Sequence, residues 1–249
     1  QVMRCVTPKT ATEVVAALRK ELHRSEDVAY QQKLVRCIIQ CSTPTTQETV
    51  TPVLFDILTA TSSVDIALDI LTFFQSTLQS SPSPQIIAEL QTALATLTLP
   101  AAVTKTLWLL SNYTQADAFE ASFDVFTTYF TSHTADLEKA DTVVVGTFAS
   151  SLTRLLLVST LTDVQRNKYT ALALRTLLVL LRTHTTQADC VDRIKTCIRC
   201  LTAPTPELRA AFLTTPPPVV LSQESSTATT HPYDEEIVFG LFNEAPDQQ

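Results

Sequence analysis

Six cysteines are the most reactive side chains in the sequence, and four of them have a spacing that zinc ligands often have. Cys37 and Cys41 lie one helical turn apart, as do Cys197 and Cys200. A structural zinc site normally combines one such pair with a second pair of cysteines or with a pair of histidines. Cys41 is followed by Ser-Thr-Pro rather than by the turn of a zinc knuckle. We therefore predict reduced cysteines that serve as small core residues, in a cytosolic protein.

The four histidines form no catalytic or metal-binding motif. We expect His23, His133 and His184 in the last turns of helices, where an imidazole suits the helix dipole, and His231 in a linker. The sequence contains no HExxH, GxSxG, GxxxxGK[ST] or kinase pattern. The charged residues in 189–195 are interpreted as a solvated helix face. The sequence therefore predicts a protein that is not an enzyme and binds no metal or other cofactor.

Glycine is almost absent, and this bears on the fold class. Only Gly146 and Gly240 occur in 249 residues. Phosphate-binding loops, dinucleotide-binding turns and tight hairpins need residues that tolerate positive φ, which glycine adopts most readily. Helices joined by short Pro, Ser and Thr links need no glycine. The composition therefore favours an all-α fold.

The charge and hydropathy of the chain argue against two classes of protein. The formal net charge is −7 and no basic stripe is visible, whereas a nucleic-acid binder normally has one. The longest apolar run, near residues 172–181, is interrupted by Arg175 and is too short to cross a bilayer. The sequence does not begin with Met, and its first residues resemble the interior of a fold. We therefore interpret it as part of a longer polypeptide.

Helix-capping signals divide residues 1–213 into about eleven expected helices. Ser or Thr caps the first free N–H groups, often with an acidic residue three positions later or Pro in the first turn. Short links make neighbouring helices antiparallel, and a row of such pairs is an α-solenoid of the HEAT or armadillo kind. The signals lie at Thr10, Thr45, Ser62, Ser83, Pro100 and Thr205.

Apolar residues within these segments recur at helical spacing and predict buried faces. Segments 143–158 and 169–181 are apolar nearly all round, so we expect each to be covered on several sides. Pro52 either bends the third helix or marks a helix that starts one turn later. The expected core positions are Val14, Ala17, Leu18 and Leu22; Leu34, Ile38 and Cys41; Ile66, Ile70, Phe73 and Leu78; Ile86, Leu90, Leu94 and Leu97; and Phe119, Phe123, Phe126 and Phe130.

The composition changes near the end of the chain and predicts three regions. Residues 1–213 form the expected α-solenoid trunk segment, and residues 214–233 form a linker rich in Pro, Ser and Thr. Residues 234–249 form an acidic and hydrophobic tail. Its apolar residues do not suit solvent, so the tail either packs back onto the solenoid or docks on a partner chain.

Six stretches occur in an order that is specific in combination. They read YQQKLVRCIIQC (30–41), VTPVLFDIL (50–58), LWLLSNY (107–113), DTVVVGTFASSLTR (141–154), CVDRIKTCIRCL (190–201) and DEEIVF (234–239). In the same order they resemble YRQLLVRTLHSC, VIPVLMEFL, LWILGEY, DFFVAATLATTLTK, VDRISLCLKVL and DDPISF of the adaptin and coatomer large-subunit family. Ser111 and Asn112 depart from the Gly-Glu pair of that family. Stretches 141–154 and 190–201 are closer to the coatomer β subunits (β-COP) than to the adaptins.

The resemblance implies the C-terminal part of a β-COP-type trunk, a structural part of the coatomer (COPI) vesicle coat in Golgi-to-ER and intra-Golgi transport. It implies that the solenoid cradles the longin domain of the δ-COP subunit and meets other coatomer subunits. An Arf-family GTPase is expected to bind trunk regions outside this chain, and the membrane is reached only indirectly, through the coat. The expected location is the cytoplasm and the cytosolic face of Golgi membranes and COPI vesicles.

Large apolar residues are the expected partner-binding residues, because such anchors dominate protein interfaces. Phe239, Leu241 and Phe242 are candidates because they lie outside the repeats. Trp108 and Tyr113 either anchor a partner or pack inside a helix pair. Two alternatives to a coatomer subunit remain at this point: the trunk of a β or γ adaptin, and a stand-alone HEAT-type transport or regulatory scaffold.

Overall fold

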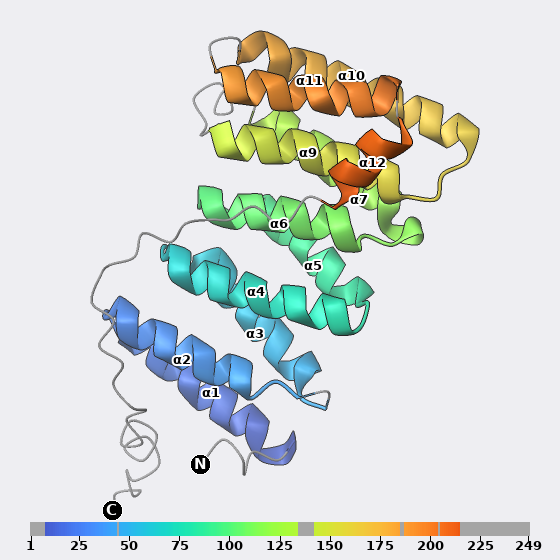
Figure 1. Ribbon diagram of the computed structural model, residues 1–249. Coiled ribbons are helices and arrows are strands. Elements are labelled where there is room, and N and C mark those ends of the chain that lie inside the picture. The colour runs from blue at the N-terminus through green and yellow to red at the C-terminus, as the bar shows by residue number, and fades with distance from the viewer. Residues whose placement is uncertain (1–7, 44, 134–141, 185–186, 204, 215–249) are drawn as a thin grey trace, which may run out of the picture. The chain divides into compact units, whose positions relative to one another are not determined.

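The computed structural model describes residues 8–43, 45–133, 142–184, 187–203 and 205–214 (Figure 1). These residues form eleven α-helices and one short 3-10 helix, and they contain no strand. They divide into two compact units, residues 8–57 and residues 58–214, and each is described by itself. Helices close in sequence pack together, which confirms the all-α, solenoid-like fold class. The linker and the tail lie outside the described residues.

The first unit holds α1 (Pro8–Arg24), α2 (Val28–Gln40) and most of α3 (Gln47–Ala60). Helix α1 begins two residues before the expected cap at Thr10, and α3 begins two residues after Thr45. The buried side of α1 consists of Ala11, Val15, Leu18 and Leu22, so the expected Val14 and Ala17 are only half-buried. Pro52 lies inside α3, which excludes a helix that starts after it.

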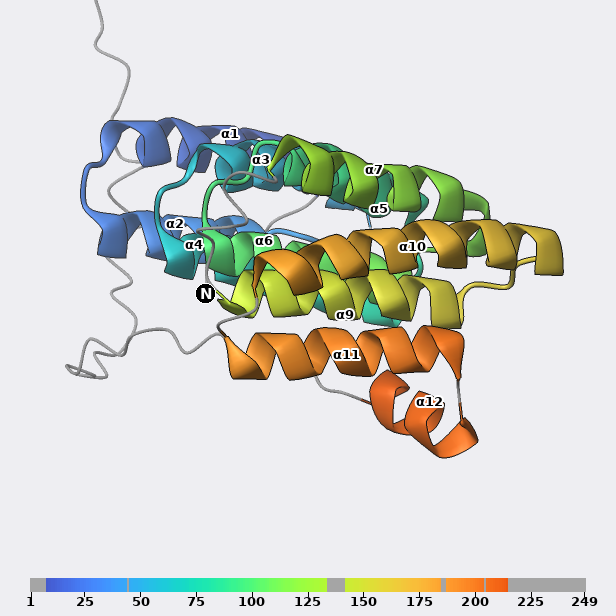
Figure 2. The same cartoon turned by 90° about the horizontal axis from the view of Figure 1, so that it is seen from above.

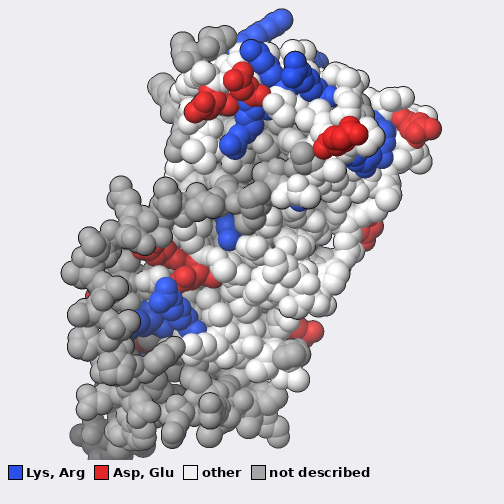
Figure 3. Space-filling view, viewed as in Figure 1, with Lys and Arg blue, Asp and Glu red and all other residues white. Residues whose placement is uncertain are grey.

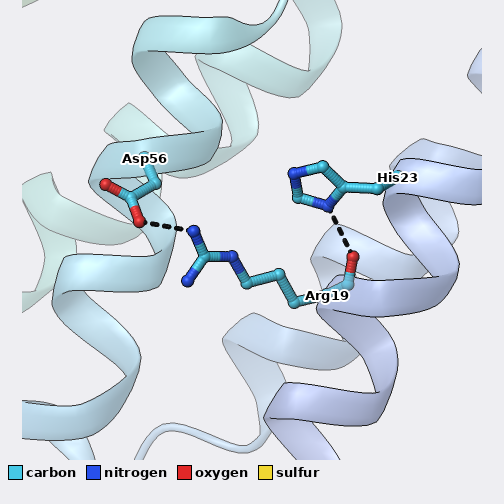
Figure 4. Close-up of polar contacts among 3 residues, drawn as sticks. All are labelled: Arg19, His23 and Asp56. Carbon is cyan, nitrogen blue, oxygen red and sulfur yellow. Dashed lines mark hydrogen bonds and ion pairs between the residues drawn. The ribbon is translucent and has the colours of Figure 1, made fainter.

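A surface ion pair joins α1 to α3 within this unit (Figure 4). Arg19 Nη2 donates a hydrogen bond to Asp56 Oδ2 at 2.8 Å, and His23 Nδ1 lies 2.7 Å from the backbone oxygen of Arg19. Both partners of the ion pair are largely exposed, so the pair contributes at most about 1 kcal/mol to stability. His23 lies in the last turn of α1, as expected.

The second unit is built as two rows of helices (Figures 1 and 2). Helices α4, α6, α9 and α11 pack successively in one row, and α5 and α7 pack together in the other. Helix α10 continues the second row beside α7 and also packs against α9 and α11. The elements are α4 (Val64–Ser80), α5 (Pro84–Leu94), α6 (Pro100–Tyr113), the 3-10 helix η2 (Ala116–Ala118), α7 (Phe119–Ser132), α9 (Thr142–Val158), α10 (Asp163–Thr183), α11 (Ala188–Thr202) and α12 (Pro206–Leu213).

Helix α9 is the centre of the second unit. It packs against α6, α7, α10, α11 and α12, which confirms that segment 143–158 is covered on several sides. Phe148 of α9 is fully buried, and its ring centroid lies 5.9 Å from that of Phe126 and 5.8 Å from that of Phe130. The aromatic stripe of α7 therefore supplies the core between α7 and α9, although Phe130 is only half-buried.

Three of the six expected caps begin helices at the predicted positions. Ser83 accepts a hydrogen bond from the backbone N–H of Ile86 and is followed by Pro84 in the first turn of α5. Thr205 caps α12 in the same way, and Pro100 lies in the first turn of α6. Helix α4 differs, because its cap is Ser63 and not Ser62. The expected stripes of α2 and α5 are buried throughout.

Helix α10 contradicts the expectation for segment 169–181. The residues that α10 buries are Tyr169, Ala173, Thr176, Leu177 and Leu180, which share one side of the helix. Leu172, Leu178 and Val179 point away from that side and are 41%, 49% and 37% exposed. The segment is therefore covered on one side, because the described residues place no helix beyond α10 in its row.

The cysteines on helices behave as small core residues, as expected. Cys41, Cys190, Cys197 and Cys200 are buried with free thiols, whereas Cys37 is half-buried. Burial raises the pKa of the Cys197 thiol to about 11. The pKa of Cys41 is also raised to about 11, first by burial and then by the nearby Cys37.

The buried Cys197 thiol predicts a specific loss of stability at high pH. Below pH 9 the thiol is protonated in both the folded and the unfolded chain, so its ionisation does not lower the free energy of unfolding there. Between pH 9 and 11 the unfolded chain loses this proton while the folded chain keeps it, which favours unfolding by about 2 kcal/mol. Urea denaturation of the wild-type chain and of Cys197→Ala across this range should show a flatter pH dependence for the variant. An equal pH dependence of the free energy of unfolding in the two chains would contradict the raised pKa of Cys197.

Candidate functional site

The outer face of α10 is the largest group of exposed apolar side chains in the part of the chain that is described. Seven large hydrophobic residues are more than a third exposed in the described ranges, and four of them lie on α10. Val164 is 81% exposed near the start of the helix, and Leu172, Leu178 and Val179 follow on the same side. We call these four residues, together with Lys168, Arg175 and Arg182, the α10 outer face. Exposed apolar clusters of this kind mark interaction sites.

The charges on the α10 outer face are all positive. Lys168, Arg175 and Arg182 are spaced by seven residues, so they repeat about every two turns on one side of the helix. The Lys168 ammonium lies 5.0 Å from the centroid of the Tyr169 ring. The described residues provide no ion-pair partner within reach of Arg175 or Arg182. The face therefore combines exposed apolar side chains with positive charges.

A groove between α10 and α11 extends this face. Its volume is about 630 Å³, and Leu178 forms part of its wall as well as part of the α10 outer face. Lys195 Nζ lies 3.9 Å from Asp192 Oδ1 on the α11 side, which leaves Arg199 as a further cation there. Figure 3 shows charged side chains gathered around this end of the second unit. The groove is lined by Leu178, Leu181, Asp192, Lys195, Thr196, Ile198 and Arg199.

Tyr169 fixes the buried side of α10 against α7. Its ring centroid lies 5.0 Å from that of Phe119 and 4.8 Å from that of Phe123, both in edge-to-face geometry. Its hydroxyl donates a 2.8 Å hydrogen bond to Glu120 Oε1. This bond, together with burial, raises the pKa of Tyr169. The rotation of α10, and hence the direction of its outer face, is set by these contacts.

Trp108 and Tyr113, which the sequence marks as possible anchors, lie together on α6. Their ring centroids are 6.2 Å apart in edge-to-face geometry, and both side chains are half-buried. Trp108 also lines a pocket of about 460 Å³, whereas Tyr113 does not. The other predicted anchors, Phe239, Leu241 and Phe242, lie outside the described residues.

Helices α6, α9, α11 and α12 enclose the pocket beside Trp108, and most of its wall was not anticipated from the sequence. Arg154 of α9 donates hydrogen bonds to the backbone oxygens of Phe212 and Leu213 and so holds the end of α12 at the pocket. We call this site the Trp108 pocket. It is lined by Trp108, Ser111, Thr147, Ser150, Ser151, Arg154, Asp192, Arg193, Thr196 and Phe212.

No cluster of side chains suited to hold a metal ion occurs among the described residues. None of the described helices has both the length and the apolar character that a bilayer-spanning helix requires. Protein-family models, curated proteins and solved structures gave no match to this chain. The exposed apolar and basic surface that α10 and α11 form at one end of the second unit is the candidate functional site.

Proposed function

We propose that the chain is a trunk segment of a coatomer large subunit of the β-COP type, which binds the longin domain of δ-COP through the α10 outer face and the adjoining groove. It acts as a structural subunit of the COPI coat and not as an enzyme. The observation that carries the proposal is the α10 outer face itself. Segment 169–181 of this helix is rich in apolar residues, yet the described residues cover only its inner side.

The position of α10 in the fold supports a partner of domain size. Helix α10 is the last described helix of its row, and α11 is the last of the other row, so both end at the same side of the second unit. A permanent subunit contact buries roughly 1,600 Å² or more in total and has an apolar core with a polar rim. The apolar residues of α10 supply such a core, and Arg175, Arg182 and Arg199 supply a basic rim.

The resemblance to the coatomer large subunits supports the identity of that partner. Three stretches that carry the resemblance lie on helices at the heart of the second unit: residues 107–113 on α6, residues 142–154 on α9 and residues 190–201 on α11. Within that family the C-terminal trunk holds a longin domain. In this proposal the Arf-family GTPase and the Golgi membrane are reached through other parts of the coat.

The experiment is capture of the δ-COP longin domain by co-expression with the full chain. We expect the wild-type chain to retain the domain on affinity purification. The double substitution Leu172→Asp and Leu178→Asp should lower the affinity on the order of 100-fold or more, because it places two charges at apolar anchor positions. Both side chains are more than a third exposed, so the melting temperature should change little.

The matched control adds the same two charges elsewhere in the second unit. Ala88 of α5 and Thr128 of α7 are both exposed, and Ala88→Asp with Thr128→Asp should leave capture unchanged. Equal capture by the wild-type chain and the α10 double variant would contradict the proposed interface. Capture of a μ or σ chain instead of the δ-COP domain would assign the chain to an adaptin. A monomeric chain that captures none of these domains would indicate a stand-alone scaffold.

A further inference from the structure

Two polar groups in the wall of the Trp108 pocket lack hydrogen-bond partners among the described residues. Ser151 is only 2% exposed, and its Oγ is buried without a partner. The indole Nε1 of Trp108 is also buried without a hydrogen-bond partner. A buried polar group without a partner costs about 1–3 kcal/mol, so such groups are few in native structures and each needs a reason. Both residues line the pocket, and both atoms are donors that an acceptor there reaches once the wall opens slightly.

The charged residues of the pocket are mainly cationic. Arg154 and Arg193 line it, and Asp192 is its one acidic residue among those described. Asp192 is 79% exposed at its side chain and lies beside Lys195, so its charge is partly balanced outside the pocket. The pocket therefore offers hydrogen-bond donors and positive charge, which favours a ligand with anionic acceptor oxygens.

The absence of a side chain at Gly146 leaves room for Arg193 beside the pocket. A glycine inside a helix costs roughly 0.5–1 kcal/mol relative to alanine, yet Gly146 lies in the middle of α9. A Cβ at this position would lie 3.0 Å from Arg193 Cδ and 3.4 Å from its Nη1. The arginine of α11 thus lies directly across the backbone of α9. This close approach accounts for a glycine in a chain that has only two.

The size and the apolar walls of the pocket exclude a simple anion as a complete ligand. Its volume of about 460 Å³ lies within the range of pockets that enclose small organic ligands. Trp108 and Phe212 form apolar parts of the wall. A ligand that satisfies the whole pocket has a carboxylate for the donors and an aromatic or aliphatic group for these two side chains.

We propose that the Trp108 pocket binds a short peptide segment of a partner protein in which a carboxylate neighbours an aromatic or aliphatic side chain. No residue of the α10 outer face lines this pocket, although Asp192 and Thr196 line both the pocket and the groove beside that face. The proposal does not depend on the identity of the subunit that binds there. We infer this ligand because its carboxylate complements the positive charge of Arg193 and Arg154. The same carboxylate can also accept hydrogen bonds from the two unpartnered donors.

Trp108 is the only tryptophan of the chain, so its fluorescence reports on the pocket directly. The probe is the peptide acetyl-Glu-Asp-Phe-Leu-amide, titrated into the full chain. We expect a saturable change in emission, at least 10-fold weaker binding of the uncharged analogue acetyl-Gln-Asn-Phe-Leu-amide, and at least 10-fold weaker binding of the acidic peptide by Arg193→Gln. Equal affinity for the two peptides, or no change in emission at millimolar peptide, would overturn the proposal.

Two further variants separate a binding role from a structural one. Gly146→Ala should displace Arg193 and weaken binding of the acidic peptide several-fold without lowering the melting temperature, because alanine suits the helix and the flexible Arg193 side chain can move. Leu172→Asp with Leu178→Asp should leave peptide binding unchanged, so failure of the coatomer proposal and failure of this one are distinguishable. Peptide binding only after removal of residues 234–249 would make the chain's own tail the occupant and contradict a partner segment.

Discussion

Phe148→Ala is expected to lower the free energy of unfolding of the second unit by about 3–5 kcal/mol, since it removes a fully buried ring from the centre of that unit. The Phe148 side chain extends from α9 toward the aromatic residues of α7. Its ring centroid lies 5.9 Å from that of Phe126 and 6.3 Å from that of Tyr129. Alanine would leave a cavity there that helices on several sides of α9 prevent from collapsing.

Urea denaturation followed by circular dichroism measures this effect, and a conservative variant calibrates it. Phe148→Leu keeps most of the volume and should cost about 1–2 kcal/mol. A loss below 1 kcal/mol for Phe148→Ala would mean that α7 and α9 do not share this core. The midpoint must be compared at an unchanged denaturant slope, because a changed slope would indicate loss of two-state behaviour.

Tyr169→Ala is expected to have an effect of similar size, about 3–5 kcal/mol, and to weaken partner capture as well. Tyr169 is 5% exposed and is the residue of α10 that packs on Phe119 and Phe123 of α7. Its removal frees α10 to rotate, and the direction of the α10 outer face depends on that rotation.

Tyr169→Phe separates the ring from the hydroxyl. This variant keeps the edge-to-face contacts and loses only the hydrogen bond to Glu120, so it should cost about 1 kcal/mol and leave capture of the δ-COP longin domain intact. Urea denaturation and the co-expression assay test both variants together. A Tyr169→Ala chain that is destabilised but captures the domain with wild-type affinity would show that the orientation of α10 is not important for binding.

Helix periodicity identified how apolar α9 and α10 are, but not what covers them. Both segments were expected to be covered on several sides, and this is correct for α9 and wrong for α10. Local sequence determines that Leu172 and Leu178 suit an apolar environment. Whether that environment comes from the same chain depends on where α10 lies in its row, which is a long-range property.

Helix boundaries followed the sequence where a cap is chemically unique. The helix starts at Ser83-Pro84 and Thr205-Pro206 are predicted correctly, because proline suits the first turn of a helix and disrupts its later turns. Ser62 and Ser63 are equally able to cap, and the preceding link decides between them. The cap differs by one residue, and the buried face of α4 contains the fully buried Phe74 in place of the expected Phe73, which is only half-buried.

The Trp108 pocket could be anticipated only in part. Its residue type makes Trp108 a candidate for either a partner anchor or helix-pair packing, but Ser151 and Arg193 come from two other helices that meet it only after folding. The one local signal was Gly146, an interior helix glycine in a chain almost free of glycine. Such a residue indicates a close approach, although the sequence does not say that Arg193 makes it.

The proposal that the α10 outer face binds a coatomer partner is tested most directly by photo-crosslinking. A benzoylphenylalanine at position 178, on the apolar side of α10, should form a covalent adduct with the co-expressed δ-COP longin domain. The same group at position 128 on the exposed side of α7 should form none. Adducts of equal yield at both positions, or an adduct at position 128 alone, would contradict the account.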